Sequence, residues 1–355
     1  MPDEAERARI ERAVRDAFGA RASVGAIEAL HGDASSRRYA RVRLGDAPVA
    51  SCVAMLLGEG RFVGGADELG GGAPLDELPF VNVARYLTAH GFTVPAIHAD
   101  RSREDGLLLI EDVGDTTLWA AVDADPSRTA TLFAAAVDEL VRLQVVGATA
   151  PDARCFAFGR RFDAALARAE LAHYVDHGIE TRHGITLPAD DRAAILAALD
   201  PVVRPFVEGP WTLSHRDYMA WNLHVQDGRL RVIDFQDALV APDAFDLAQL
   251  LTDRTTERRV DAALEGELVA RFETGRAAAG LPVPPGFADR YRRCALQHVF
   301  KVIGRFYLLE VVNKRPGYLA YLPSVYAVGG RMLRELPDLG AAAPMLRRWT
   351  PELVA

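Results

Sequence analysis

The chain has 355 residues, of which half are hydrophobic and a quarter charged, and its formal net charge is −8. This acidic balance argues against nucleic acid as the main partner, because binding to phosphate backbones needs a basic surface. No apolar run reaches the length of a membrane span and no signal peptide opens the chain, so we expect a cytoplasmic protein without membrane contacts.

The first third of the sequence favours β-structure. Apolar spacing predicts a helix at 4–18, strands at 24–30, 38–44 and 49–57, a helix at 78–90, and strands at 96–99 and 106–110. The turn after the first strand contains Gly32 and the hydroxyls of Ser35 and Ser36. These groups could contact phosphate oxygens, although a turn of this composition is more often a plain hairpin.

The remainder of the sequence favours helices. Glu111, Asp112, Val113 and Gly114 break the strand pattern and form a natural linker, where Glu111 and Val113 are candidate adenine contacts. Beyond the linker, helices are predicted at 116–122, 127–146, 160–177, 190–207, 244–253, 257–278, 287–310 and 318–335. A β-rich part followed by a helical part predicts an α+β fold with two lobes, at residues 1–112 and 113–355.

The chemistry is concentrated between residues 213 and 237. His215-Arg216-Asp217 is followed by Asn222 and then by Asp234, the order of a kinase catalytic loop and its metal-binding aspartate. Asp217 is the candidate acceptor of a substrate hydroxyl proton. Asn222 and Asp234 offer the oxygen ligands that Mg2+ prefers.

A predicted hairpin explains how the two metal ligands meet. Strands at 223–226 and 230–233 flank Asp227-Gly228, a strong turn signal. We therefore expect Asn222 at the start of one strand and Asp234 at the end of the other to lie side by side.

Other polar residues have more than one interpretation. His215 is expected to pack and hydrogen-bond within the loop, and Asp246 resembles an aspartate that braces such a loop. Arg216 could position the loop or contact substrate. Lys301 and Arg305, one turn apart on a predicted helix, form either a solvated face or a basic site for an anionic substrate group.

These motifs resemble those of the aminoglycoside phosphotransferase-like kinases. Within that superfamily the chain is similar to the anomeric kinases of N-acetylmuramate and N-acetylglucosamine. The stretches that carry the resemblance are residues 33–41, 107–117, 215–223, 232–238, 241–247 and 298–306. The resemblance implies a bilobal protein-kinase-like fold, with ATP as co-substrate, Mg2+ as cofactor and an amino sugar phosphorylated at C1 during peptidoglycan recycling.

One departure from the wider kinase pattern concerns charge. Kinases place a lysine on the third strand to hold phosphates, but both lysines here, Lys301 and Lys314, lie in the C-terminal region. Arg38 or Arg41, the metal or the backbone must then take that role. Two alternatives stay open: another small-molecule kinase, for aminoglycosides, choline or homoserine, and a pseudokinase that binds nucleotide without turnover. The oligomeric state is left open.

Overall fold

The computed structural model describes residues 3–30, 37–58, 76–226 and 228–354. The chain folds into two compact units. The first contains the N-terminal part as far as Asp115 together with residues 226–236, and the second contains residues 116–225 and 237 onward. The predicted lobes, residues 1–112 and 113–355, stay a prediction.

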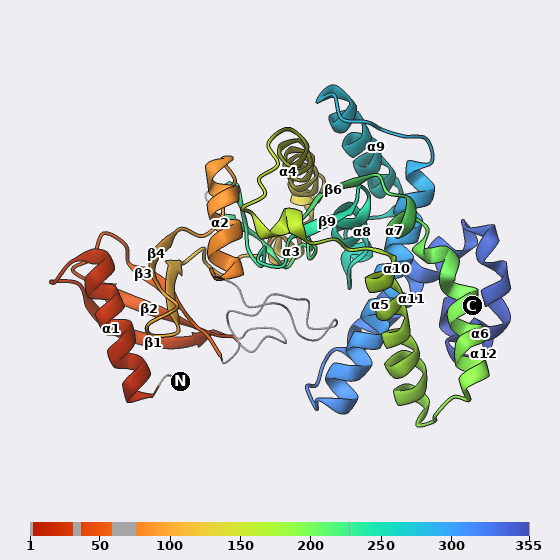
Figure 1. Ribbon diagram of the computed structural model, residues 1–355, viewed down its shortest axis with the longest axis horizontal. Coiled ribbons are helices and arrows are strands. Elements are labelled where there is room, and N and C mark those ends of the chain that lie inside the picture. Colours follow the sequence, from red (N-terminus) through yellow and green to blue (C-terminus); the bar gives the residue numbers. More distant parts are fainter. Residues whose placement is uncertain (1–2, 31–36, 59–75, 227, 355) are drawn as a thin grey trace. The chain divides into compact units, whose positions relative to one another are not determined.

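The first unit is built on one antiparallel sheet. Its strands run in the order β1 (Ser23–Leu30), β2 (Arg38–Gly45), β3 (Ser51–Leu56), β5 (Leu107–Glu111) and β4 (Ile97–Arg101). Helix α1 (Glu4–Phe18) packs against this sheet (Figure 1). Its apolar face, with Ile10 and Val14, is fully buried with Val42 and Leu109 of the strands, as the i, i+4 spacing predicts.

Residues 226–236 join the first unit through an aromatic contact and a backbone hydrogen bond. Helix α2 (Pro79–Ala89) places Phe80 against Phe235, with ring centroids 4.8 Å apart. The amide of Val232, at the end of β8 (Arg229–Val232), donates to the carbonyl of Thr93 at 2.9 Å. These contacts explain why residues 226–236 belong to this unit.

The second unit is mainly helical. Its helices are α3 (Leu118–Ala124), α4 (Thr129–Thr149), α5 (Ala164–His173), α6 (Ala189–Leu199), α7 (Pro205–Glu208), α8 (Phe245–Thr252), α9 (Ala262–Ala278), α10 (Phe287–Tyr307), α11 (Leu322–Arg334) and α12 (Ala343–Trp349). Strands β6 (Trp211–Ser214) and β9 (Leu239–Pro242) form one small sheet, and a further short strand, β7, covers Leu223–Gln226.

Helix α10 organises the second unit. It packs against α5, α8 and α11, as Figure 1 shows, and against a π-helical segment, Tyr174–Thr181, that continues α5. Gly304 permits the close approach, because a Cβ there would lie 2.8 Å from the carbonyl oxygen of His173. A larger residue at 304 would force α10 away from α5.

The predicted α+β class is confirmed, with particular differences. The two π-helical segments, Tyr174–Thr181 and Leu308–Val312, extend helices that the sequence predicts as regular. Strand β9 and helix α12 were not predicted. Both are short, so their hydrophobic patterns span too few residues to show a period.

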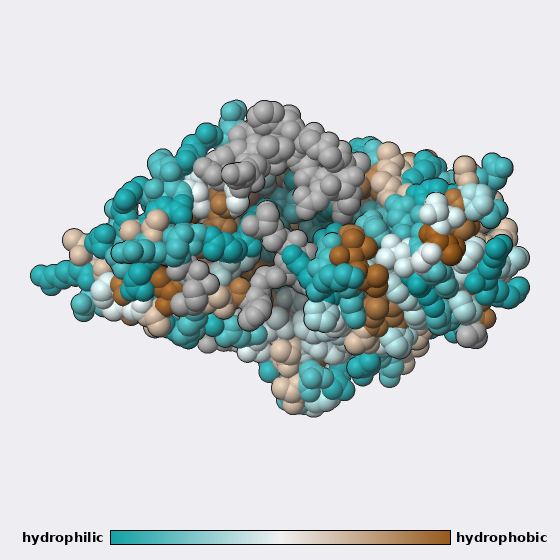
Figure 2. Space-filling model, turned by 90° about the horizontal axis from the view of Figure 1, so that it is seen from below, coloured by the Kyte–Doolittle hydropathy of each residue, from teal (hydrophilic) through white to brown (hydrophobic). Residues whose placement is uncertain are grey.

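Hydrophobic side chains are scattered over the surface. The face in Figure 2 is mostly hydrophilic or neutral, with separate hydrophobic areas. The large hydrophobic side chains exposed in the described ranges are Ile185, Val207, Val311 and Val312. None of the helices described is both long enough and apolar enough to span a bilayer.

Candidate active site

The loop that follows β6 is fixed by one buried carboxylate. Asp246 of α8 accepts hydrogen bonds from the hydroxyl of Ser214 at 2.7 Å and from the backbone amides of His215 at 2.7 Å and Arg216 at 3.1 Å. Arg216 has a φ of 78°, a left-handed conformation that is costly for a residue with a Cβ. The three bonds to Asp246 oppose that cost and hold the backbone in place.

The next turn of the loop is equally constrained. The carbonyl of Asp217 accepts from the amide of Met219 at 3.0 Å and from the side-chain Nδ2 of Asn222 at 2.9 Å. The amide of Tyr218 donates to Oε1 of the buried Gln249 at 3.1 Å. Because Asn222 uses its amide nitrogen within the loop, the direction of its Oδ1 is also fixed.

Asp217 lies in a positive environment. Its Oδ1 is 3.9 Å from Nζ of Lys301, and 28% of its side chain is exposed. Burial alone would raise the pKa of Asp217, but the charges of Lys301 and Arg216, with contributions from nearby histidines, hold it below the ordinary carboxyl value. The carboxylate is therefore ionised at neutral pH.

Lys301 contacts a second carboxylate that the sequence did not single out. Its Nζ lies 3.4 Å from Oε1 of Glu170, which is buried on α5 and also accepts from Nε2 of Gln297. Gln297 and Lys301 are four residues apart on α10, so both face Glu170. A glutamate within the otherwise apolar buried face of residues 166–171 is a signal that could have been found.

Asp234 belongs to the first unit, and like Arg216 it has a left-handed backbone conformation. Its φ is 63°, and its Oδ1 accepts from Nε2 of Gln236 at 2.8 Å. Asn222 belongs to the second unit, so the pairing of these residues in one metal site stays a prediction. No cluster of three or more His, Cys, Asp or Glu that could bind a metal was found among the described residues.

The arginines proposed for phosphate binding have acidic partners. Arg38 pairs with Glu6 of α1. Arg41 donates from Nε to Asp112 at 2.7 Å and from Nη2 to Asp115 at 2.8 Å, and Ser51 also donates to Asp112. Arg41 lies on β2 and its charge is compensated by Asp112 and Asp115, so its role in phosphate binding stays a prediction.

The remaining predicted nucleotide contacts are only partly described. Glu111, at the end of β5, pairs with Arg231 at 3.0 Å, and Val113 follows in the linker. Ser35 and Ser36 lie outside the described residues. Their roles stay predictions.

Arg305 lies one turn beyond Lys301 on α10, and within the described ranges no ion pair joins it to another side chain.

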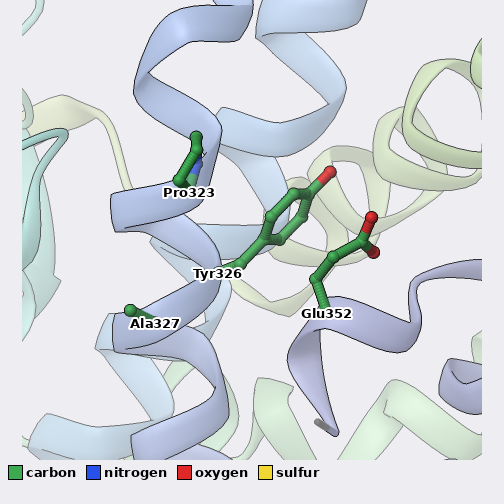
Figure 3. A pocket seen from close by; sticks show the side chains of 4 residues that line it. All are labelled: Pro323, Tyr326, Ala327 and Glu352. Carbon is green, nitrogen blue, oxygen red and sulfur yellow. The ribbon is translucent and has the colours of Figure 1, made fainter.

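A separate concavity of about 440 Å3 is lined by Pro323, Tyr326 and Ala327 of α11 and by Glu352 (Figure 3). Glu352 pairs with Arg182, which also donates to the Tyr326 hydroxyl. None of the residues predicted for the site lines this concavity.

Comparison with known sequences gives a family. Residues 26–282 match the phosphotransferase enzyme family. The N-acetylmuramate/N-acetylglucosamine kinase of Pseudomonas aeruginosa is 32% identical, over 76% of this chain and 78% of that protein. The kinase of the same description from Caulobacter vibrioides is 30% identical, over 84% of this chain and 85% of that protein.

Solved structures show the same fold. An amicoumacin kinase in complex with AMP-PNP, Ca2+ and its ligand aligns with a TM-score of 0.56 at 15% identity, over 88% of each chain. The choline kinase of Cryptosporidium parvum aligns with a TM-score of 0.54 at 15% identity, over 94% of this chain and 97% of that one. The kinase-like bilobal fold expected from the resemblance is thereby confirmed.

Proposed function

Since the chain belongs to the phosphotransferase enzyme family, we propose that it is an ATP-dependent kinase that phosphorylates the anomeric hydroxyl of N-acetylmuramate, N-acetylglucosamine or both. The observation that carries the proposal is an ionised Asp217 on a rigid loop, beside Lys301. The N-acetylmuramate/N-acetylglucosamine kinases from four bacteria supply the substrate class.

In this proposal Asp217 performs the proton transfer. Its carboxylate orients the sugar hydroxyl and accepts its proton as the oxygen attacks the γ-phosphate of ATP. The new bond joins the anomeric oxygen to phosphorus, and the bond to the bridging oxygen of ADP breaks. The products are a sugar 1-phosphate and ADP, and the proton passes from Asp217 to solvent.

Asn222 and Asp234 are the proposed ligands of Mg2+. An amide oxygen and one carboxylate suit Mg2+, which completes its coordination with phosphate oxygens and water rather than with a protein cage. The bonds from Asn222 to the Asp217 carbonyl and from Gln236 to Asp234 fix the direction of both side chains. When bound, the ion neutralises charge on the phosphates.

The proposed biological setting is what the resemblance to cell-wall sugar kinases implies. A sugar 1-phosphate made from cell-wall amino sugars is ready for transfer to a nucleotide, so we place the activity in peptidoglycan recycling in the cytoplasm. The partners are then two small molecules, ATP and an amino sugar.

The test is an acceptor screen with ATP and Mg2+, with products identified by phosphorus and proton NMR. We expect a phosphate coupled to the anomeric proton. Asp217→Asn should lower kcat by about 10²–10⁴-fold while MgATP affinity is retained. Asp234→Ala should abolish activity and weaken Mg2+-dependent ATP binding in calorimetry. A 6-phosphate product would refute the anomeric assignment, and full activity of Asp217→Asn would remove the proposed base.

A further inference from the structure

Glu170 is a buried charge in the packing between α5 and α10. Its side chain is 2% exposed and lies on a helix face whose other buried residues are apolar. Oε2 accepts a hydrogen bond from Nε2 of Gln297, and Oε1 lies 3.4 Å from Nζ of Lys301. Within the described ranges Lys301 is the one cation that pairs with it. Because a buried carboxylate without a cation is strongly destabilising, Glu170 depends on Lys301.

The same ammonium group lies near a second carboxylate. Nζ of Lys301 is 3.9 Å from Oδ1 of Asp217, whose side chain is 28% exposed. Glu170 is closer and less screened by water, so its attraction for the ammonium is the stronger of the two. The ammonium is thereby kept farther from Asp217 than the roughly 2.7–2.9 Å of a charge-assisted hydrogen bond. Among the described residues no hydrogen bond is donated to the carboxylate of Asp217, so its oxygens are open to a hydroxyl.

The packing of α5 on α10 limits how far Lys301 can move relative to Glu170. The two helices lie side by side in Figure 1, and α10 also packs on the π-helical segment that continues α5. A Cβ at Gly178 in that segment would lie 3.0 Å from Cγ2 of Ile303, two residues after Lys301. With the close approach at Gly304, this leaves little room for a shift of the helix. A π-helical turn is rare and is frequent at functional sites.

We propose that Glu170 is a positioning residue for the phosphoryl transfer, which holds the ammonium of Lys301 beside Asp217 and prevents it from closing onto that carboxylate. Asp217 then has a positive charge nearby and still has an oxygen open to the acceptor hydroxyl. Glu170 is buried and acts through Lys301, without contact to the reacting atoms. This inference rests on the proposed function.

Two consequences distinguish positioning from a purely structural ion pair. When Glu170 is uncharged, the attraction that opposes Asp217 is lost, so the ammonium of Lys301 moves into a direct hydrogen bond with Asp217 and competes with the hydroxyl. When Lys301 is absent, Glu170 has no ammonium to hold, so its replacement no longer slows catalysis. An ion pair that only stabilises the fold predicts neither effect in a folded protein.

The test measures kcat/KM for each amino sugar at saturating MgATP, at a temperature well below the melting transition of every variant. Glu170→Gln keeps the side-chain volume and an acceptor for Gln297. It should lower kcat/KM by about 10–100-fold, the size of one charge-assisted hydrogen bond that must break before the hydroxyl binds. The loss should be equal for N-acetylmuramate and N-acetylglucosamine, with MgATP affinity unchanged in calorimetry. In a Lys301→Met background, Glu170→Gln should lower kcat/KM by no more than about twofold, or raise it.

Glu265→Gln is the matched control. Glu265 is also buried, at 5% exposure, and it pairs with Arg331 of α11 and Tyr291 of α10 instead of a residue near the loop. This variant should lose stability in urea and keep the kcat/KM of the wild type.

The outcomes separate the inference from the function on which it rests. A folded Glu170→Gln with the kcat/KM of the wild type, or an equal loss in both backgrounds, overturns the positioning role while the proposed function stands. If Glu170→Gln fails to fold, the double variant decides. It should be at least as active as Lys301→Met, and a clear further loss overturns the inference. A wild-type protein that phosphorylates neither sugar overturns both.

Discussion

Replacing Lys301 with methionine should shift the pH dependence of catalysis. The Nζ of Lys301 and Oδ1 of Asp217 are 3.9 Å apart. Two unit charges at about 4 Å interact by about 1 kcal/mol in water and about 4 kcal/mol at an effective dielectric constant of about 20. Because 28% of Asp217 is exposed, we take the lower part of that range, which corresponds to about one to two pKa units.

The direction of the shift follows from the charges. Lys301 favours the ionised form of Asp217, so its removal raises the pKa of that carboxyl toward and beyond its ordinary value. Glu170, left at the same position without Lys301, acts in the same direction. The acid limb of the kcat/KM profile should therefore move to higher pH by at least about one unit, equally for both sugars.

The assay quantifies ADP by chromatography in quenched reactions between about pH 3 and pH 8, since kcat/KM reports ionisations of the free enzyme. Lys314→Met is the control, because Lys314 is the other lysine in the sequence and is exposed. Its profile should match that of the wild type. An acid limb that stays in place in Lys301→Met, with folding and MgATP binding intact, would show that Lys301 does not set the ionisation of Asp217.

Three further predictions concern stability, each read as a change in the free energy of unfolding in urea. Asp246→Asn leaves at least one buried donor of the loop without an acceptor and should cost about 1–3 kcal/mol of unfolding free energy. Activity should fall by a larger factor than this loss of stability alone explains. A variant as stable as the wild type would contradict the role of Asp246 in holding the loop. Arg41→Met removes the charge that pairs with Asp112, which keeps its hydrogen bonds from Ser51 and Gly114, and should cost about 1–3 kcal/mol at pH 7. Burial alone would raise the pKa of Asp112, but Arg41, Ser51 and Gly114 hold it below the ordinary value. The stabilisation by Arg41 is therefore present above about pH 4 and is lost as the pH falls through the lowered pKa. The difference in unfolding free energy between variant and wild type should narrow in acid, and a difference that widens there would contradict the pairing. Gly304→Ala should cost about 1–3 kcal/mol, because its Cβ would meet the backbone of α5. The control is Gly266→Ala, in open space on α9, which should be neutral or stabilising. Equal effects of the two substitutions would mean that packing at α10 is loose.

The residues of the catalytic loop could be proposed from the sequence because they lie close together in the chain, and their roles stay predictions. The order His215, Asp217, Asn222 depends on residues within one short loop, where chemistry fixes residue type and spacing together. The helix at 4–18 and the strands of the first unit were found because their apolar periods extend over enough residues to be distinctive.

Contacts between distant segments could not be predicted in the same way. Glu170 is 131 residues before Lys301, and only the packing of α5 on α10 brings their charges to 3.4 Å. That packing depends on Gly304, whose importance is steric and leaves no periodic signal. The position of Arg254 beside Trp221 depends likewise on the turn after α8, where a left-handed residue other than glycine gives no sequence warning.

Helix α10 brings charge to the catalytic loop without taking part in the hydrogen bonds from Asp246 that hold the loop backbone. The family match ends at residue 282, before α10 begins at Phe287, and it includes the loop and Asp246. Yet Gln297, His298 and Lys301 of α10 contact Glu170, Asp253 and Asp217 respectively. Substitutions on α10 can therefore change the charge that an acceptor meets without altering the bonds that hold the loop. We therefore expect charge substitutions on α10 to change the ionisation of Asp217, and substitutions at Asp246 to change the position of the loop.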